Sequence, residues 1–402
     1  MAKTLRVGMI GYGFMGKAHS NAWRQAPYFF SLKARTELHT ICGRNPAGVQ
    51  AARAKLGWQF ASTDWQELVE SPFIDIVDIS THNDSHAEIA IAAAQAGKHV
   101  LCEKPLALNV KQAEAMLAAV RNAKVVHMVC HNYRRVPAIA HAKRLIVEGA
   151  LGQIRHFHAR YAQDWLVDPD APLRWKLDKV ISGSGAHGDI GVHLIDLARY
   201  LVGEFKEVCG LTHIFINERP LPPEAAAPDA PPKATAAKLK PGKAAPSAAP
   251  AVPMGKVTVD DAAVFIGTFA NGALANLEVT RYAPGRKNQL AFEINGSKGS
   301  LVFDLEDMNR LKFCDANSLP DRQGFRDILV LQPNGAHPYV NHWWRAGHLL
   351  GYEHTFVHTV ADFVNACAEG KPVQPTFEDG LQNQRVLAAV EESFKKRAWV
   401  KL

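Results

Sequence analysis

The chain has 402 residues, of which 47% are hydrophobic and 21% charged, and its formal net charge is +7. This length suits two or three domains, and the composition excludes a mainly disordered chain, a collagen-like fibre and a disulfide-dense miniprotein. The charge is a weak indication of nucleic-acid binding, because residues 219–256 carry +4 of it. The rest of the sequence shows no basic stripe on a recognisable nucleic-acid fold, so we expect no nucleic-acid partner.

The sequence also lacks the marks of a membrane or secreted protein. It has no uninterrupted apolar run of about 18 residues, so we expect no membrane span. Its first residues lead into a short strand-like run instead of a signal peptide. The 6 cysteines lie far apart with no Cys-x-x-Cys pair, which favours reduced, buried thiols. We expect a cytoplasmic protein.

The first 131 residues alternate between strand-like and helix-like segments. Short, nearly continuous apolar runs predict buried strands at residues 5–10, 38–42, 74–79, 99–102 and 125–130. Helix-like stretches separate them, at residues 14–25, 47–56, 84–96 and 109–122. This alternation is typical of α/β proteins with a parallel, doubly wound sheet, and it predicts a Rossmann dinucleotide-binding domain over residues 1–131.

After residue 150 the pattern changes to strands with few helices between them. We predict strands at 154–161, 206–215, 262–269, 273–280, 289–294 and 300–303, and helices at 187–202, 351–369 and 379–396. The pair Asn271-Gly272 is a hairpin signal between two of these strands. Residues 132–402 are therefore expected to form an α+β domain with a large, open, mostly antiparallel sheet.

Residues 219–256 interrupt this second domain with a low-complexity segment rich in proline, alanine and lysine. Such residues offer little to bury, and proline removes backbone donors, so no packed core is expected there. We predict an exposed, disordered-type insertion, for which an inert role is favoured over a partner-binding arm.

A glycine-rich turn follows the first predicted strand and opens the first helix. It consists of Gly11, Tyr12, Gly13, Phe14, Met15 and Gly16, in the pattern Gly-x-Gly-x-x-Gly. The glycines permit a tight turn and a close approach of the backbone to a pyrophosphate, and the helix N-terminus supplies NH groups. This strand–turn–helix context favours dinucleotide binding over a structural turn.

The end of the second strand bears on the choice between NAD and NADP. An acidic residue here would bind the ribose diol of NAD, but the sequence has Gly43 and Arg44. Arg44 can neutralise a 2′-phosphate, which slightly favours NADP, or remain solvated with NAD bound. Both cofactors stay open at this point.

Polar residues follow the third and fourth strands, where ligands bind in open parallel sheets. Ser80, Thr81, His82 and His86 follow the third strand, and Glu103 and Lys104 follow the fourth. We expect these residues to face the cofactor. Beside a nicotinamide, a partly desolvated Lys104 can lower the pKa of a substrate hydroxyl or help to move its proton.

The other half of the reacting centre is expected in the glycine-rich segment 182–193. Asp189 and His193 are four residues apart and share a face if the helix has begun there. His193 can take a proton as the C–H bond gives up its hydride, and a nearby carboxylate can orient the charged imidazole. A plain helix salt link is the alternative for such a pair.

Three motifs in this order carry a resemblance: Gly11-x-Gly13-x-x-Gly16, Glu103-Lys104-Pro105 and Asp189-x-Gly191-x-His193. Together they resemble the glucose–fructose oxidoreductase/inositol dehydrogenase/MocA (Gfo/Idh/MocA) family, over the whole chain except 219–256. The resemblance implies catalytic positions for Lys104, Asp189 and His193, with His193 as acid/base. It also implies a cofactor contact from Asn132 and a homodimer or homotetramer formed through the C-terminal sheet.

Within this family the chain is most similar to enzymes that oxidise the C3 hydroxyl of sugars. The similarity lies in residues 13–20, 132–135, 163–165 and 198–205, and it implies NAD, from which Gly43-Arg44 departs. A sugar, anhydrosugar or glycoside is the expected substrate. Lys104, Asp189 and His193 are expected to contact it, with Tyr133, Arg134, Gln163 and Trp165. Further candidates for stacking on the sugar are Trp175, Trp343, Trp344 and Tyr352.

Two other functions remain open. One is an enzyme that retains its cofactor and cleaves glycosides through a transient 3-keto intermediate, and the other is a non-catalytic cofactor sensor. Keeping Lys104, Asp189 and His193 together argues against the sensor. Despite 18 histidines, no clear metal-ligand spacing occurs, so we expect no required metal.

Overall fold

The computed structural model describes residues 3–222 and 252–402. Its N-terminal part is a six-stranded parallel sheet in the order β3-β2-β1-β4-β5-β6, which confirms the predicted Rossmann topology. The strands are β1 (Thr4–Ile10), β2 (Arg35–Cys42), β3 (Phe60–Ser62), β4 (Ile76–Ile79), β5 (His99–Cys102) and β6 (His127–Val129).

Helices connect the parallel strands. They are α1 (Phe14–Phe29), α2 (Pro46–Leu56), α3 (Trp65–Glu70), α4 (His86–Gln95) and α5 (Val110–Ala123). Asn45, Asp64 and Asn109 cap α2, α3 and α5, because each side chain accepts a hydrogen bond from a backbone NH of the first turn. Neither β3 nor α3 was predicted.

The C-terminal part is a nine-stranded mixed sheet in the order β16-β15-β14-β13-β7-β12-β11-β8-β17. Only the β12–β7 pair is parallel among the described strands of this sheet, so the mostly antiparallel prediction is confirmed. The strands are β7 (Ile154–Ala162), β8 (Phe205–His213), β11 (Ala262–Phe269), β12 (Leu274–Thr280), β13 (Gln289–Gly296), β14 (Gly299–Asp304), β15 (Arg310–Asp315), β16 (Arg326–Leu329) and β17 (Val400–Lys401).

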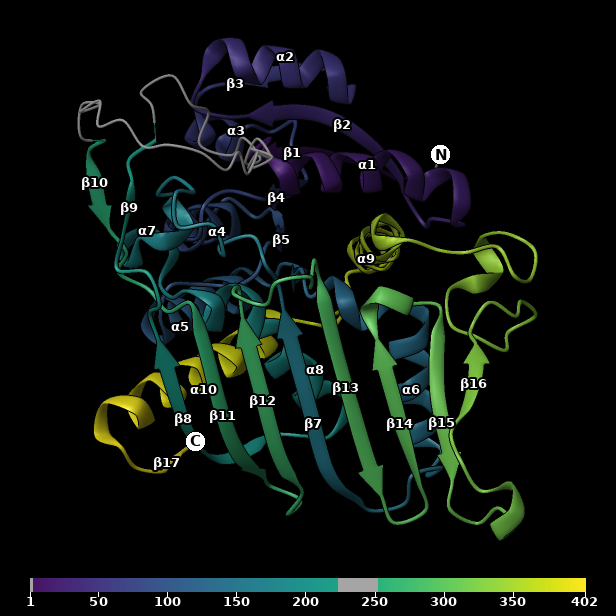
Figure 1. Cartoon of the computed structure of the whole chain (residues 1–402). Helices are drawn as coiled ribbons and strands as arrows, with labels where there is room; N and C mark the ends of the chain where they lie inside the picture. Colours follow the sequence, from purple (N-terminus) through teal and green to yellow (C-terminus); the bar gives the residue numbers. More distant parts are fainter. Residues whose placement is uncertain (1–2, 223–251) are drawn as a thin grey trace, which may run out of the picture.

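One face of this sheet is covered by helices. In Figure 1, α6 (Pro137–Val147), α8 (Val192–Leu201) and α10 (Phe377–Lys396) lie behind the sheet, and within the drawn residues the near face carries no helix. Apolar residues of both layers form one large core, which includes Phe157, Leu197, Phe265 and Val390. The described helices include none long and apolar enough to cross a membrane.

The segment after the large sheet returns to the N-terminal part of the molecule. Helix α9 (Tyr352–Glu369) packs against α1, and Phe356, Val360 and Phe363 share a core with Leu5 and Trp23. The hydrophobic core beside the parallel sheet therefore includes residues from both sides of the predicted boundary at residue 131. The strands themselves are divided between the two sheets as that boundary predicts.

Short elements complete the described chain. They are α7 (Lys179–Ser182), a π-helical turn (His187–Gly191) and single 3₁₀ turns at Asn83–Ser85, Asn132–Arg135, Trp175–Leu177, Leu305–Asp307, Pro320–Arg322 and Val340–His342. All 6 cysteines are free thiols.

The ends of the predicted insertion 219–256 are ordered, which corrects its boundaries. Strands β9 (Glu218–Pro220) and β10 (Met254–Lys256) pair as an antiparallel ribbon, and Arg219 is fully buried. Residues 223–251 of the predicted insertion lie outside the described residues.

Candidate active site

A cavity of about 440 Å³ lies where the glycine-rich turn, the ends of β4 and β5 and the start of α8 meet. Fourteen residues predicted from the sequence to contact cofactor or substrate line it: Gly13, Phe14, Met15, Ser80, Thr81, His82, Glu103, Lys104, Asn132, Tyr133, Gln163, Trp165, Asp189 and His193. Residues far apart in sequence therefore share one cleft beyond the carboxyl ends of the parallel strands, as expected for this topology.

The glycine-rich turn lies against the end of β4. Gly11 has φ +104°, and a Cβ on Gly11 would overlap the main-chain oxygen of Ser80, while one on Gly16 would overlap that of Gly11. A side chain is therefore excluded by crowding at both positions, and at Gly11 also by the left-handed backbone. Gly13, Phe14 and Met15 reach the cavity, whereas Gly11, Tyr12 and Gly16 form the turn without lining it. The turn has the close-packed form that a pyrophosphate site needs.

The end of β2 lies outside the cavity. A Cβ on Gly43 would overlap the ring of Tyr12, so the tyrosine requires glycine at this position. Gly43 and Arg44 do not line the cavity, and Asn45 begins the cap of α2 directly after them.

Lys104 joins the two parts of the molecule. It follows β5, and its Nζ donates to the main-chain oxygen of Asp189 at 2.8 Å and to Oδ1 of Asp189 at 3.2 Å. Only 14% of the lysine side chain and 15% of the aspartate side chain are exposed. The ammonium group of an N-terminal-domain residue is thus fixed beside the start of α8.

The Asp189 carboxylate holds two further cations. Lys176 Nζ lies 3.2 Å from both of its oxygens, and a guanidinium nitrogen of Arg281 lies 3.0 Å from Oδ2. Burial opposes the charge of Asp189, but Lys176, Lys104 and Arg281 outweigh it and hold the pKa of the carboxyl well below its usual value. Asp189 is therefore an anion that holds three cations, of which Lys104 and Lys176 line the cavity.

His193 is a neutral base at the cavity wall. Burial, and then the positive charge of Lys104, lower the pKa of its imidazole well below the usual value. Its Nδ1 has no hydrogen-bond partner among the described residues. The sequence predicted that a carboxylate would orient this imidazole, but the Asp189 side chain is bonded to the three cations instead. The π turn before α8 still brings Asp189 and His193 to the same cavity.

Behind Lys104, a buried charged network supports Glu103. His19 Nε2 lies 2.9 Å from Glu103 Oε1, and its Nδ1 lies 2.9 Å from Asp78 Oδ1. Burial opposes a charged imidazole, but the carboxylate of Asp78 raises the pKa of His19 well above its usual value. His19 is therefore a cation that donates from both nitrogens and anchors the residue that precedes Lys104.

The opposite wall of the cavity is a hydrogen-bonded polar surface. The Tyr133 and Tyr161 hydroxyls lie 3.0 Å apart, and Tyr161 donates to Asn288 Oδ1 at 2.8 Å. Gln163 Nε2 also donates to Asn288 Oδ1, at 2.7 Å, and Trp165 Nε1 donates to Gln163 Oε1 at 2.9 Å. The predicted contacts Tyr133, Gln163 and Trp165 thus form one surface of hydroxyl, amide and indole groups, suited to a polyhydroxy ligand.

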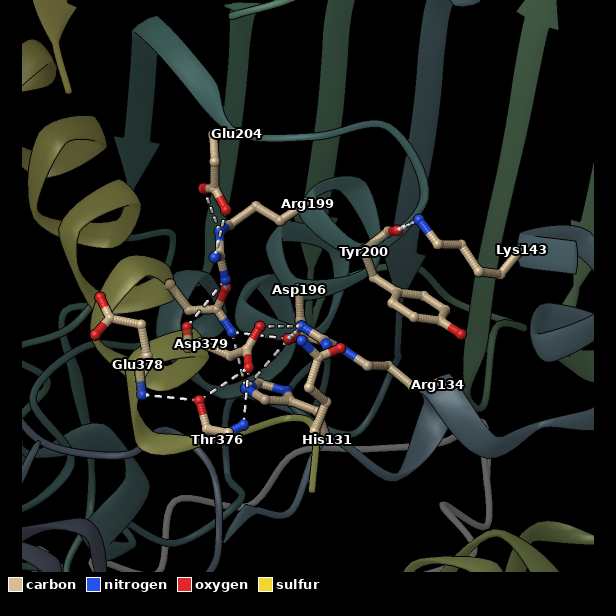
Figure 2. A network of polar contacts seen from close by, with 12 residues as sticks. His131, Arg134, Lys143, Asp196, Arg199, Tyr200, Glu204, Thr376, Glu378 and Asp379 are labelled. Atoms are coloured by element: carbon tan, nitrogen blue, oxygen red, sulfur yellow. Dashed lines mark hydrogen bonds and ion pairs between the residues drawn. The ribbon is translucent and has the colours of Figure 1, made fainter. Parts of the chain in front are cut away.

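Arg134 does not reach the cavity, which corrects its prediction as a substrate contact. Its guanidinium donates to both oxygens of Asp196 at 2.7 Å and to Asp379 at 3.1 Å (Figure 2). The side chain is 5% exposed. Its charge is satisfied inside the protein, because the buried carboxylate of Asp196 and the partly buried carboxylate of Asp379 both accept from it.

Two other predicted features also lie away from the cavity. His86 is fully buried, with Nδ1 3.0 Å from the main-chain oxygen of Pro105, so it supports the segment after Lys104 and does not face a cofactor. Trp343 donates to His358 Nε2 at 2.6 Å and packs on Phe29. Trp344 also packs on Phe29, so of the stacking candidates only Trp165, Trp175 and Tyr352 line the cavity.

Five residues that line the cavity were not predicted from the sequence: Asn83, Tyr161, Lys176, Ile190 and Asn288. A signal for Tyr161 existed, because it lies two residues before Gln163 and alternate strand residues share a face. Asn288 carried no such signal, since its place depends on the pairing of β13 with β7.

The fold and the cavity are those of a dinucleotide-binding oxidoreductase. The sequence profile of an oxidoreductase family with an NAD-binding Rossmann fold matches residues 5–131, and that of the GFO/IDH/MocA C-terminal domain matches residues 139–302. The chain is 44% identical over 400 residues to levoglucosan dehydrogenase of Pseudarthrobacter phenanthrenivorans, covering 99% of this chain and 98% of that protein. The chain belongs to the Gfo/Idh/MocA family.

Solved structures agree with this assignment. An oxidoreductase domain protein from Kribbella flavida superposes with a TM-score of 0.91 at 52% identity, over 100% of this chain and 99% of that chain. Levoglucosan dehydrogenase in complex with NADH and levoglucosan superposes with a TM-score of 0.89 at 42% identity, again over 100% and 99%.

Proposed function

We propose that this chain is an NAD-dependent sugar dehydrogenase that moves a hydride between a ring carbon, C3, and the nicotinamide. The substrate class is a sugar, anhydrosugar or glycoside. The observation that carries the proposal is that Lys104 and His193 line one cavity with the glycine-rich turn and a hydrogen-bonded polar wall. The similarity to levoglucosan dehydrogenase over 98% of that protein supports NAD and a levoglucosan-like substrate.

The residues suit a dinucleotide at one end of the cavity. The turn 11–16 would hold its pyrophosphate against the N-terminus of α1, and Ser80, Thr81 and Asn132 would hold the nicotinamide end. Once bound, NAD⁺ supplies the acceptor for the hydride. The crowded glycines support this fit, because side chains there would fill the cradle.

The chain's own residues would handle the proton. Neutral His193 takes the hydroxyl proton as the hydride leaves the ring carbon, and Lys104 stabilises the negative charge that develops on the same oxygen. Asp189 keeps Lys104 in place through two hydrogen bonds. Tyr133, Gln163 and Trp165 bind the remaining hydroxyls and one apolar face of the ring.

The open sheet face supports a homodimer or homotetramer. Leu211, Val264, Ile266 and Leu274 lie on adjacent strands and are each 45–58% exposed, on the sheet that Figure 1 shows without a covering helix on its near side. Apolar side chains on neighbouring strands are typical of a surface that a partner covers.

The test is a spectrophotometric screen of monosaccharides, anhydrosugars and glycosides with NAD⁺ and, separately, NADP⁺. We expect NADH formation with levoglucosan-like substrates and a 3-keto product by NMR. Aglycone release without net NADH would contradict the dehydrogenase and favour glycoside cleavage. Binding of NADH with no turnover of any sugar would favour a sensor.

A further inference from the structure

Arg219, on β9, is a buried cation outside the cavity. Its side chain is fully buried, and its guanidinium donates to the main-chain oxygens of Leu166 and Asp168 at 2.7 Å and of Ala171 at 3.2 Å. It also donates to the Tyr282 hydroxyl at 2.6 Å. All four acceptors are neutral oxygens. A buried charge is costly without such partners, so the site is built around this guanidinium.

Three of these acceptors belong to the loop that forms one side of the cavity. The loop runs from β7 to the 3₁₀ turn Trp175–Leu177, and it supplies Gln163, Trp165, Trp175 and Lys176 to the lining. A further bond, from the backbone NH of Leu173 to the oxygen of Pro220 at 2.7 Å, ties the loop to β9. The loop is thus held from outside by the β9–β10 ribbon.

The fourth acceptor links Arg219 to the charged centre. Tyr282 directly follows Arg281, whose guanidinium lies 3.0 Å from Asp189 Oδ2. The Arg281 guanidinium also lies over the Trp165 ring, 5.2 Å from its centroid. The Arg219 guanidinium therefore connects two segments. One is the loop that carries Trp165, and the other is Tyr282, whose neighbour Arg281 is bonded to Asp189.

We propose that Arg219 is a positioning residue for substrate recognition, which fixes Trp165 and Arg281 relative to Asp189. It acts through these side chains and does not line the cavity. The inference rests on the proposed sugar oxidation and goes beyond it, because it assigns part of substrate recognition to the β9–β10 ribbon, which lies outside the cavity.

The test compares Arg219→Ala, Tyr282→Phe and wild type with levoglucosan and NAD⁺. Small displacements of binding groups are costly, so we expect the KM for levoglucosan to rise about tenfold in Arg219→Ala, with a smaller fall in kcat. NADH affinity should stay within twofold of the wild-type value.

Guanidinium chloride at tens of millimolar should lower the KM of Arg219→Ala again, because free guanidinium can occupy the vacated site. Tyr282→Phe, which removes one hydroxyl, should show a smaller rise. Arg322→Ala, at an exposed arginine, is the control. Its KM for levoglucosan should equal that of wild type, and guanidinium should not alter it.

The outcomes separate the two hypotheses. Wild type that oxidises no sugar overturns the proposed function, and the recognition role of Arg219 with it. Active wild type with an unchanged KM in Arg219→Ala overturns the inference alone. Parallel losses of kcat, NADH affinity and thermal stability, with no response to guanidinium, also overturn it, because they mark a purely structural residue. If Arg219→Ala does not fold, the KM of Tyr282→Phe decides.

Discussion

Lys104 Nζ donates to the main-chain oxygen of Asp189 at 2.8 Å, and this bond crosses from the end of the parallel sheet to the π turn that precedes α8. Two of the three protons of an ammonium group can be used by Asp189, through its main-chain oxygen and Oδ1, and the third remains for a ligand oxygen. The contact therefore fixes the distance between the two halves of the site and leaves Lys104 able to bind an alkoxide.

The first prediction concerns proton transfer. Lys104→Ala and His193→Ala should each lower kcat/KM by about 10²- to 10⁴-fold, because in the proposed mechanism each removes a group that handles the substrate's proton or its developing charge. Steady-state kinetics and NADH titration should show lost turnover with retained cofactor binding. Lys312→Ala, at an exposed lysine of β15, is the matched control for Lys104→Ala. Normal turnover in both variants would show that the assignment of these residues is wrong.

Lys104, Asp189 and His193 also show how much of the site could be predicted from the sequence. The strand ends and the glycine turn follow from local patterns, so residues there, such as Lys104, could be placed beside the cofactor site. The four-residue spacing of Asp189 and His193 placed both in one cleft. It could not show that Asp189 binds Lys176 and Arg281, because those contacts depend on how a loop and the end of β12 pack together.

Arg134 shows how a residue can be wrongly predicted to contact the substrate. The family similarity of residues 132–135 and the hydrogen-bonding guanidinium predicted a contact with a sugar hydroxyl. Its acceptors Asp196 and Asp379, however, lie far along the chain, on α8 and α10. Short elements such as β3, with three residues, were missed for a related reason, since so few residues show no periodicity.

The second prediction concerns the buried ion pair between Arg134 and Asp196. Arg134→Met should lower the free energy of unfolding by about 3–5 kcal/mol, because it leaves the Asp196 carboxylate buried without its main cation. Asp196→Asn should also destabilise, and the double variant should lose less than the sum. Chemical denaturation measures all three, with Arg322→Met as control. A variant of unchanged stability but raised sugar KM would instead support substrate binding by Arg134.

The third prediction concerns metals. His19, Glu103 and Cys130 place their ligand atoms within 4.8 Å of one another, in the arrangement of a metal site. However, His19 is held as a cation by carboxylates on both nitrogens, so it has no lone pair for a metal. Treatment with a chelator should leave activity and melting temperature unchanged, and elemental analysis should find no stoichiometric metal in the active protein. Activity lost to the chelator and restored by one metal would refute this.

The fourth prediction concerns acid stability and His358. This residue is fully buried; its Nδ1 donates to the Arg135 oxygen at 2.9 Å, and its Nε2 accepts from Trp343 at 2.6 Å. A proton on Nε2 would face the indole NH, and burial above all lowers the pKa of His358 to about 3. Between about pH 6.5 and pH 3 the unfolded chain thus binds a proton that the native state does not, so stability is full above pH 6.5 and falls with acidification.

This one group contributes up to about 1.4 kcal/mol per pH unit to that fall. His358→Gln should be less stable than wild type at pH 7, because Gln cannot make both hydrogen bonds, yet its stability should decline less steeply from pH 6 to pH 4. Denaturation series across this range, without cofactor, measure the slope. His348→Gln, at an exposed histidine, should keep the wild-type slope. An equal slope in His358→Gln and wild type would mean that His358 titrates alike in both states, against the burial and bonding that hold it neutral.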